Sequence, residues 1–384
     1  MAVERGMAAH VVIGCARESA PGEHRVALTP ETCRKLAAAG ASVRVERGLG
    51  AKSYFTDDAY AEAGANLVDD ANAAVGDADL VLCVQPPPAR VIGWLKPGAT
   101  LVGILQPQGD EARAEALQAR GIVAFPLERL PRTTRAQAMD VLSSQAGMAG
   151  YKAVLIAAQL APRFFPMLTT AAGTIRPSKV LVVGAGVAGL QAIATARRLG
   201  AQVEGFDVRP ETREQIESLG GKFLDLGVSA AGEGGYARAL SEDERAEQQR
   251  RLGKHLEGVD VVVCTAAVPG RPAPKIISAA MVAGMKPGSV IVDLAAETGG
   301  NCELTQPGDT IATDGGVTIA GPLDLASLGA LHASEMYARN VFNFVQLLLK
   351  DGALGFDWND ELLAKTVWPQ APVAPPVAEP SPAA

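Results

Sequence analysis

Aromatic side chains are scarce in this chain, and their scarcity limits how its interior can be built. Phe, Trp and Tyr make up only 4% of the 384 residues, whereas hydrophobic residues make up 48%. The interior therefore has to consist of Ala, Val, Leu and Gly, as is common in proteins that alternate strands and helices. The chain is also too long for one ordinary hydrophobic core, which predicts two domains.

Basic clusters and paired cysteines are missing as well. The chain has 35 basic and 42 acidic residues, for a net charge of −7, and no block of Lys and Arg is large enough to indicate a nucleic-acid partner. The five cysteines form no Cys-x-x-Cys pair, and no histidine stands near them at a ligand spacing. This pattern favours reduced, packed thiols in a cytoplasmic protein over a metal centre or a disulfide framework.

No segment is apolar enough to cross a membrane. A spanning helix needs about 20 consecutive apolar residues, and the nearest candidate, Ala153–Ala172, is interrupted by Pro162, Arg163 and Pro166. Residues Met1–Ala9 carry charges without an apolar centre, unlike a signal peptide. We therefore expect a soluble chain that meets a membrane only indirectly, through partners.

A glycine-rich loop between a strand and a helix is the most informative feature that is present. The apolar strand Val180–Val183 leads into the segment Gly-Ala-Gly-Val-Ala-Gly, and a helix-forming run follows. In this pattern Gly184 allows the tight turn, Gly186 lets the backbone approach a pyrophosphate, and Gly189 permits close packing of helix on strand. The free N–H groups and positive dipole of the helix N-terminus then attract phosphates.

An acidic residue follows this loop at the distance that a dinucleotide site requires. The strand Gln202–Phe206 ends on Asp207, about 20 residues downstream. A carboxylate there accepts hydrogen bonds from ribose hydroxyls and repels a 2′-phosphate, which predicts NAD(H) rather than NADP(H). Arg209 softens this discrimination without reversing it. The alternative is a glycine turn that only packs.

The order of the expected elements predicts an α/β fold of two Rossmann-like domains with parallel sheets. Helices at about Arg135–Phe164 and Ala326–Leu349 carry the chain from the first domain to the second and back, so the NAD(H)-binding domain is inserted into a discontinuous first domain. The expected boundaries are 10–145 with 326–368 for the first domain, 146–325 for the Rossmann NAD(H)-binding domain, and 369–384 for a Pro-rich tail.

The segment between residues 227 and 258 is too long for a plain crossover between strands. Gly234 and Gly235 precede Tyr236, and glycines beside an exposed aromatic residue indicate either a mobile flap over the cofactor or an ordinary surface loop. A capping box from Ser241 to Glu244 then starts a charged helix.

A polar cluster follows an expected strand of the first domain and therefore begins at the carboxyl end of a sheet. It runs from Arg132 to Ser144, and Gln137, Asp140 and Ser144 fall three and four residues apart, as on one face of a helix. Arg132, Gln137 and Asp140 could bind a carboxamide, a ribose or a pyrophosphate through hydrogen bonds. The alternative is a loop–helix salt bridge between Arg132 and Asp140, with Ser143 on the surface.

Neither histidine nor lysine stands at the carboxyl end of a first-domain strand. The relevant strand ends are Cys83-Val84-Gln85 and Ile104-Leu105-Gln106, and the four histidines lie elsewhere. A dehydrogenase that reduces a keto acid needs a proton donor, usually His or Lys. The acid–base group of a substrate dehydrogenase is therefore not evident in the sequence.

These motifs together resemble the alanine dehydrogenase/transhydrogenase family, and within it the NAD(H)-binding component of proton-translocating NAD(P) transhydrogenases. The resemblance rests on Arg17–Pro30, Arg132–Tyr151, Thr170–Thr174, Gly184–Ala194, Asp207–Arg209 and Asp293–Asn301. It implies a homodimer in which hydride passes directly between NAD(H) on this chain and NADP(H) on a partner subunit. It also implies a membrane proton-channel subunit, which would hold the chain at the inner face of the plasma membrane.

The same resemblance assigns site residues. It implies that Arg132, Gln137, Asp140 and Ser143 form the loop that positions the nicotinamide. It assigns cofactor binding to Gly184, Ala185, Gly186, Val187, Gly189, Asp207, Val208 and Arg209, with Gly235 and Tyr236 in a mobile loop and with Gln248 and Ala267. Transfer between two nicotinamide rings needs no acid–base group on this chain, which agrees with the missing His and Lys.

Two other functions stay open. An alanine dehydrogenase-like enzyme would aminate a keto acid on the same scaffold, but that family places a Lys and a His where this chain has Cys83 and the edge Ile104–Gln106. A non-catalytic NAD(H)-sensing module would regulate a partner, although the polar cluster at 132–144 is more than a sensor requires.

Overall fold

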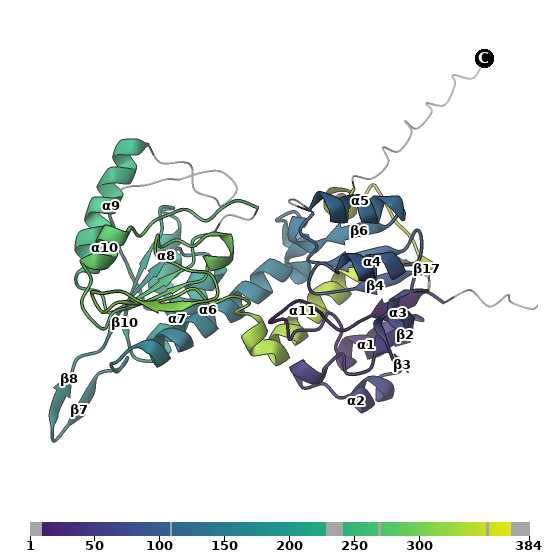
Figure 1. Ribbon diagram of the computed structural model, residues 1–384, viewed down its shortest axis with the longest axis horizontal. Helices are drawn as coiled ribbons and strands as arrows, with labels where there is room; N and C mark the ends of the chain where they lie inside the picture. Colours follow the sequence, from purple (N-terminus) through teal and green to yellow (C-terminus); the bar gives the residue numbers. More distant parts are fainter. Residues whose placement is uncertain (1–9, 108–109, 228–240, 268–269, 351–352, 370–384) are drawn as a thin grey trace, which may run out of the picture. The chain divides into compact units, whose positions relative to one another are not determined.

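The computed structural model describes residues 10–107, 110–227, 241–267, 270–350 and 353–369 (Figure 1). The chain divides into two compact units, one formed by residues 1–144 and 330–384 and the other by residues 145–329. The first boundary falls inside the long helix α6 (Val141–Leu160).

The first unit is a doubly wound parallel sheet. Its six strands lie in the order β3-β2-β1-β4-β5-β6, and every neighbouring pair is parallel. The strand order reverses between β1 and β4, which makes that point the switch point of the sheet. The strands are β1 (Val12–Cys15), β2 (Ser42–Glu46), β3 (Asn66–Val68), β4 (Leu80–Leu82), β5 (Thr100–Gly103) and β6 (Val123–Pro126).

The first five helices of the first unit alternate with its strands, and two more come from the returning segment. They are α1 (Pro30–Ala38), α2 (Asp57–Glu62), α3 (Ala71–Val75), α4 (Ala89–Trp94), α5 (Glu111–Ala119), α11 (Ala330–Val345) and α12 (Glu361–Thr366). The start of α1 follows from its local sequence, because the Thr29 side chain caps the helix and Pro30 is its first residue.

The returning helix α11 belongs to the core of the first unit. Its Tyr337 and Phe344 are fully buried, and the Phe344 ring lies 5.3 Å from that of Phe125 on β6. The Tyr337 hydroxyl donates to the carbonyl oxygen of Cys83 at 2.9 Å and accepts the N–H of Ile104 at 3.1 Å. One side chain from the far end of the sequence therefore joins the ends of β4 and β5.

The second unit is also a doubly wound sheet, with the order β11-β10-β9-β12-β13-β15-β14. All pairs are parallel except β14 with β15, and the order reverses between β9 and β12. The strands are β9 (Lys179–Val183), β10 (Gln202–Phe206), β11 (Lys222–Phe223), β12 (Val261–Cys264), β13 (Val290–Asp293), β14 (Thr310–Ala312) and β15 (Thr318–Ala320). The expected α/β class with parallel, Rossmann-like sheets is confirmed.

Successive side chains of the buried strands point to opposite faces of this sheet and pack in two separate hydrophobic cores, one on each face. Val180 and Val182 pack with α6 and with α7 (Val187–Arg198). Leu181 and Val183 pack on the other face with α9 (Glu242–Leu256) and α10 (Ala279–Ala283). The helix α8 (Thr212–Ser218) contributes Ile216 to the first of these cores. The capping box expected at Ser241 and Glu244 is present at the start of α9.

One sequence expectation about the helices was wrong. The run 135–164 is not a single helix, because Thr134–Met139 forms a 3-10 helix and α6 begins only at Val141. Asp140 separates the two with an extended backbone (φ −75°, ψ 91°). Its carboxylate accepts the N–H of Ser143 at 2.9 Å, and a short polar side chain that bonds its own backbone in this way favours a helix start over a helix interior. Gln137 and Ser144 therefore do not share a helix face.

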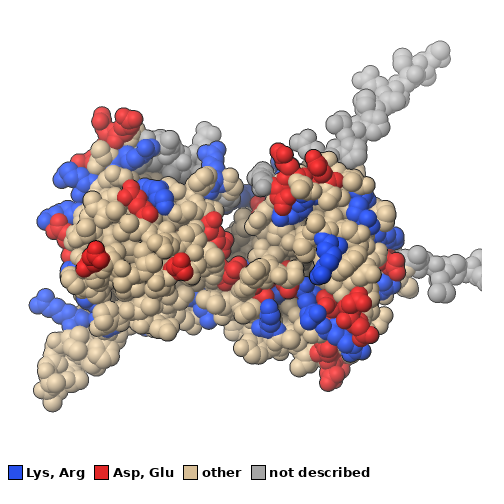
Figure 2. All heavy atoms as spheres, in the orientation of Figure 1, with Lys and Arg blue, Asp and Glu red and all other residues tan. Residues whose placement is uncertain are grey.

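A two-stranded hairpin, β7 (Leu168–Thr170) and β8 (Gly173–Ile175), extends from the sheet of the second unit (Figure 1). Leu168 opposes Ile175 and Thr169 opposes Thr174 across the pair. The face of Leu168 and Ile175, which Thr170 shares, is therefore the apolar face of the hairpin, and the opposite face carries the hydroxyls of Thr169 and Thr174. Residues 167–175 carry no charge. On the face of the molecule in Figure 2, in contrast, acidic and basic side chains are interspersed over both units.

Within the described residues, no helix combines the length and the apolar character that crossing a membrane requires. The five cysteines are all free and buried, so the expectation of packed thiols is confirmed.

Candidate functional site

The glycine loop lies at the switch point of the second unit, where β9 ends and α7 begins. Gly184 has φ +94°, a conformation that glycine adopts without strain. A Cβ at Gly189 would lie 1.9 Å from the carbonyl oxygen of Gly184, so only glycine allows the helix to start this close to the strand. A Cβ at Gly186 would meet no described atom within 4 Å. The expected roles of Gly184 in the turn and of Gly189 in packing are therefore present, and open space lies beside Gly186.

The N-terminus of α7 is suited to an anion. Gly186 is the residue before the helix, and among the described side chains none caps this end. The N–H groups of the first turn are thus left to a ligand or to water. Val187, in that turn, is 46% exposed. This geometry fits the diphosphate of a dinucleotide.

The carboxylate of Asp207 joins the end of β10 to the glycine loop. It accepts the N–H of Ala185 at 2.8 Å. Ala185, itself predicted to bind the cofactor, is therefore hydrogen-bonded to Asp207. Arg209 donates to the same carboxylate from its backbone N–H and its guanidinium. Burial raises the pKa of Asp207, but the hydrogen bonds from Arg209 and Ala185 together lower it by a larger amount. The pKa therefore lies below its ordinary value.

The end of β12 lies on the other side of the switch point, and hydrogen bonds of Thr265 and Asn301 hold its backbone in place. The Thr265 hydroxyl donates to the carbonyl oxygen of Gly184 at 2.9 Å. The fully buried Asn301 amide accepts the N–H of Ala266 at 3.0 Å and donates to its carbonyl oxygen at 2.7 Å. The Ala266 backbone in turn lies against Gly184. Asn301 therefore sets the position of the wall beside the glycine loop.

Thr265 and Asn301 were not predicted as site residues. Asn301 closes the sequence motif that begins at Asp293, and Asp293 accepts the N–H of Cys302 at 2.9 Å beside it. Thr265 directly follows a buried strand at the switch point. Position after that strand was thus a usable signal for Thr265, but the contact of Asn301 with Ala266 depends on the fold.

The polar loop of the first unit is held by its apolar residues and presents its polar ones. Ala136 and Met139 are buried in the core, whereas Arg132 and Gln137 are exposed. The carbonyl oxygen of Ala138 accepts hydrogen bonds from two asparagines of α11, Asn340 at 2.8 Å and Asn343 at 2.9 Å. Arg135 forms a two-pronged ion pair with Asp360 at the start of α12. The loop is therefore fixed at several points while Arg132 and Gln137 are accessible to a ligand.

Asp140 and Ser143 have a structural role that the sequence pattern did not indicate. Asp140 accepts both the N–H of Ser143 at 2.9 Å and its hydroxyl at 2.6 Å, which caps the N-terminus of α6. Each oxygen of this carboxylate can accept a second hydrogen bond, so both oxygens can still bind a ligand.

The other predicted residues fall in three places. Val208 follows Asp207 and is half-buried. Gln248 is buried within α9, and Ala267 is exposed two residues after Thr265. Gly235 and Tyr236 lie outside the described residues, as does the rest of the proposed flap at 228–240.

The switch point of the first unit is filled by the protein's own charged side chains. Glu18, after β1, accepts the N–H of Val84 at 2.5 Å and that of Gln85 at 3.2 Å, so the backbone donors after β4 are already used. Glu23 binds the guanidinium of Arg25 and accepts from the Gln85 amide at 2.9 Å. These internal bonds leave the glycine loop of the second unit as the better dinucleotide site.

Glu18 is a titratable group at the switch point of the first unit, where the strand ends carry no His or Lys. The residue as a whole is half-buried, but its carboxylate is turned inward onto the N–H groups of Val84 and Gln85. Burial raises the pKa of Glu18 to about 7, and the two backbone donors offset only part of that effect. An acid that holds its proton near neutral pH therefore lies at this edge, although its carboxyl group is buried.

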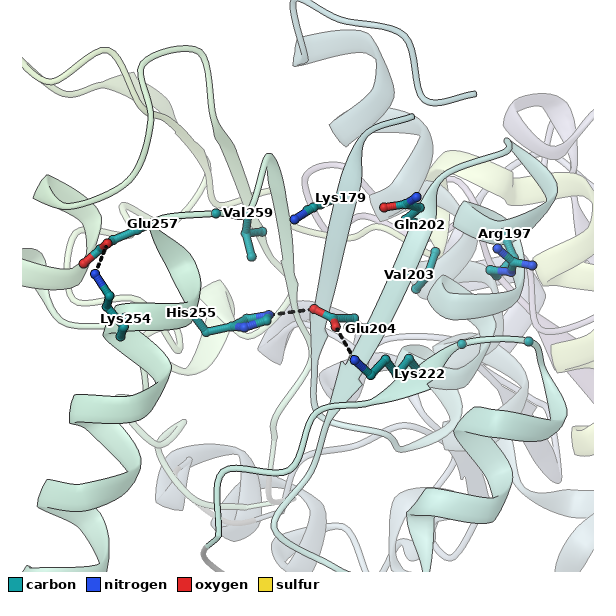
Figure 3. A pocket seen from close by; sticks show the side chains of 13 residues that line it. Lys179, Arg197, Gln202, Val203, Glu204, Lys222, Lys254, His255, Glu257 and Val259 are labelled. Carbon is teal, nitrogen blue, oxygen red and sulfur yellow. Dashed lines mark hydrogen bonds and ion pairs between the residues drawn. The ribbon is translucent and has the colours of Figure 1, made fainter. Parts of the chain in front are cut away.

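A hollow of about 750 Å³ lies at the opposite edge of the second sheet, where β9 and β10 begin (Figure 3). His255 and Glu204 meet across it at 2.6 Å, and Lys254 pairs with Glu257 at 2.7 Å. Helices α7 and α9 both end there, and their negative dipole ends disfavour phosphate. Parallel sheets bind ligands at the carboxyl ends of their strands, which again indicates the glycine loop.

The strand order, the glycine loop at the switch point and the acid after the next strand define a dinucleotide-binding α/β protein. The chain belongs to the alanine dehydrogenase/PNT family, whose N-terminal domain matches residues 14–149 and whose C-terminal domain matches residues 153–371.

Three relatives show where in this family the similarity lies. In Rhodospirillum rubrum, the first segment of NAD(P) transhydrogenase subunit alpha is 46% identical over 342 residues, which cover 87% of this chain and 89% of the relative. Alanine dehydrogenase of Bacillus subtilis is 30% identical over 298 residues, covering 76% and 72%. A crystal structure of transhydrogenase from Sinorhizobium meliloti superposes with a TM-score of 0.84 at 43% identity, covering 93% of this chain and 97% of that one.

The two glycines of the loop should respond differently to substitution. Gly189→Ala places a Cβ 1.9 Å from a backbone oxygen and should lower the free energy of unfolding of the second unit by ~1–3 kcal/mol or more. Gly186→Ala adds its Cβ to open space at an ordinary φ of −79° and should change stability by less than about 0.5 kcal/mol. Urea unfolding of both variants measures this, and equal destabilisation would contradict the packing described for Gly189.

The buried Glu18 should make stability fall as the pH rises. Its pKa of about 7 in the folded chain exceeds the ordinary 4.5, so its contribution is complete below pH 4.5 and is lost as the pH rises through 7. The shift corresponds to about 3 kcal/mol. Relative to Glu18→Gln, the natural chain should lose that stability between pH 5 and 8. Glu115→Gln, on the surface of α5, supplies the baseline for removing one negative charge. A pH-independent difference between the natural chain and Glu18→Gln would exclude the effect.

Proposed function

We propose that this chain is the NAD(H)-binding subunit of a proton-translocating NAD(P) transhydrogenase. In this function NADH bound here reduces NADP⁺ bound on a partner subunit by direct hydride transfer, coupled to proton movement across a membrane. The support is the glycine loop with its acid at the switch point of the second unit, together with the 46% identity to a transhydrogenase alpha subunit over most of the chain.

The chemistry of the first unit agrees with transfer between two nicotinamide rings. Such a transfer moves no proton to a substrate carbonyl, so it requires alignment of the rings within about 3–3.5 Å and no general acid. The strand ends that follow β4 and β5 carry Gln85 and Gln106, and the thiol of Cys83 has a pKa raised well above its ordinary value by burial. The buried Glu18 is bonded to backbone instead of facing outward.

The polar loop of the first unit supplies the positioning groups in this proposal. Arg132 and Gln137 are exposed on a loop whose backbone is fixed by Asn340 and Asn343. A fixed loop with exposed polar side chains holds a ring in one orientation at little entropic cost. Asp140 and Ser143 fix the start of α6 directly after the loop, and the backbone N–H of Asp140 donates to the carbonyl oxygen of Gln137 at 3.3 Å.

The partners in this proposal are an NADP(H)-binding subunit, a membrane proton-channel subunit and a second copy of this chain. The chain would then be cytoplasmic and peripheral at the inner face of the plasma membrane, reached through those subunits. The second copy is supported by the hairpin β7–β8, because a lone two-stranded hairpin is only marginally stable in water. Met167, directly before the hairpin, is 65% exposed and Ile175, in β8, is 45% exposed, as expected of residues that another chain covers.

The catalytic component of the proposal is tested by replacing Gln137. Hydride transfer from NADH to an NADP⁺ analogue is followed with the cognate NADP(H)-binding subunit, and NADH binding is measured separately by fluorescence. Gln137→Ala should slow transfer at least tenfold while changing the Kd for NADH less than threefold. Gln118→Ala, an exposed glutamine on α5, is the control and should change neither quantity. Unaltered transfer in Gln137→Ala would show that the loop does not position the nicotinamide.

The same preparation separates the two alternative functions. Turnover of NADH with pyruvate and ammonium by the chain alone would identify an alanine dehydrogenase-like enzyme and exclude the proposal. Binding of NADH without transfer in any mixture would identify an NAD(H)-sensing module.

The hairpin provides a test of the homodimer. Sedimentation of the natural chain should give twice the 39.6 kDa chain mass. Ile175→Glu places a charge on the apolar face of the hairpin and should shift the equilibrium to monomer by at least tenfold. Thr174→Glu, its neighbour on the opposite face, should leave the dimer largely intact. Dissociation by both variants, or by neither, would contradict this account of the apolar face.

A further inference from the structure

Asp207 has no acceptor position to spare. One carboxylate oxygen accepts the N–H of Ala185 and Nη2 of Arg209, both at 2.8 Å. The other accepts the backbone N–H of Arg209 and its Nε, both at 2.9 Å. A carboxylate offers about four such positions, and all four are used. The ribose hydroxyls of a bound NAD(H) would therefore have to replace existing partners.

The partners that can be replaced belong to the guanidinium. The N–H groups of Ala185 and Arg209 are part of the backbone, one in the glycine loop and one in the turn before α8, where the carbonyl oxygen of Arg209 accepts the Thr212 hydroxyl at 2.7 Å. The guanidinium is the end of a long side chain that is 20% exposed. A ribose hydroxyl can replace one of its two hydrogen bonds, and the other then keeps the guanidinium on the carboxylate.

The ion pair also changes the electrostatic argument about cofactor choice. Asp207 and Arg209 together carry no net charge, so simple repulsion by the carboxylate cannot by itself reject a 2′-phosphate. Rejection instead depends on Asp207 keeping the guanidinium engaged, since Arg is the side chain best suited to bind a phosphate with two hydrogen bonds.

The other arginine on the same side is engaged elsewhere. Arg213, in α8, donates to Asp225 at 2.7 Å, and its guanidinium lies 4.3 Å from the centre of the Phe223 ring. It therefore provides a matched cation that Asp207 does not hold.

We propose that Arg209 is a specificity-determining residue, a latent 2′-phosphate ligand that Asp207 holds in a two-pronged ion pair and so withholds from NADP(H). The inference rests on the proposed binding of NAD(H) at the glycine loop. It assigns the choice of NAD(H) to the pair of residues instead of to the acid alone.

The test measures NADH and NADPH binding to the full chain without partner subunits, by nicotinamide fluorescence. Asp207→Asn keeps an oxygen for the N–H of Ala185 but loses the charge that holds Arg209. It should strengthen NADPH binding at least tenfold and weaken NADH binding. The gain for NADPH should disappear in Asp207→Asn/Arg209→Gln and persist in Asp207→Asn/Arg213→Gln. Arg209→Gln alone leaves the carboxylate unpaired and should weaken NADPH binding further.

Two results would overturn the inference: no gain for NADPH in a folded Asp207→Asn variant, or a gain that survives removal of Arg209. The Arg209→Gln variant decides the matter if Asp207→Asn does not fold, because unchanged or improved NADPH binding in it contradicts the inference. Failure of the natural chain to bind NADH would instead remove the proposed function, so the two failures are distinguishable.

Discussion

The contact between the start of α7 and the backbone of the glycine loop is the constraint on which the second unit depends. At Gly189 the helix approaches the Gly184 carbonyl so closely that no side chain fits between them. The same carbonyl accepts the Thr265 hydroxyl, and the Ala266 backbone lies against Gly184. Strand, loop, helix and the end of β12 are thereby joined at one point, and the open space beside Gly186 is what is left for a ligand.

The two units show how one strand order supports different uses. Both sheets reverse their order at a switch point, after β1 and β4 in one and after β9 and β12 in the other. In the second unit, glycines leave backbone N–H groups exposed there. In the first unit, the corresponding backbone N–H groups of Val84 and Gln85 already donate to the Glu18 carboxylate. Function therefore follows from the residues at the switch point, because the fold alone does not distinguish the two sites.

Much of the fold was predictable because its signals are local. The run Val180–Val183, the glycines after it and Asp207 after the next strand specify a strand, a turn and an acid at fixed spacing, and the structure contains each of them. Thr29 and Ser241 cap helices as their sequence context indicates. The prediction of one helix over 135–164 was wrong because the helical spacing of its residues does not reveal a break at Asp140. The 3-10 helix ends there, and the Asp140 side chain caps the start of α6.

The sequence by itself determined the α/β class, the dinucleotide loop and the position of its acid, since these depend on neighbours along the chain. Only the tertiary structure decided what the acid touches. It brings Ala185 and Asp207 together, folds Arg209 back onto the carboxylate, and places Asn301 behind Ala266. It also buries the Glu18 carboxylate and raises its pKa. Partners and burial come from segments far apart in the chain, and their effects on charge and hydrogen bonding are therefore absent from any local pattern.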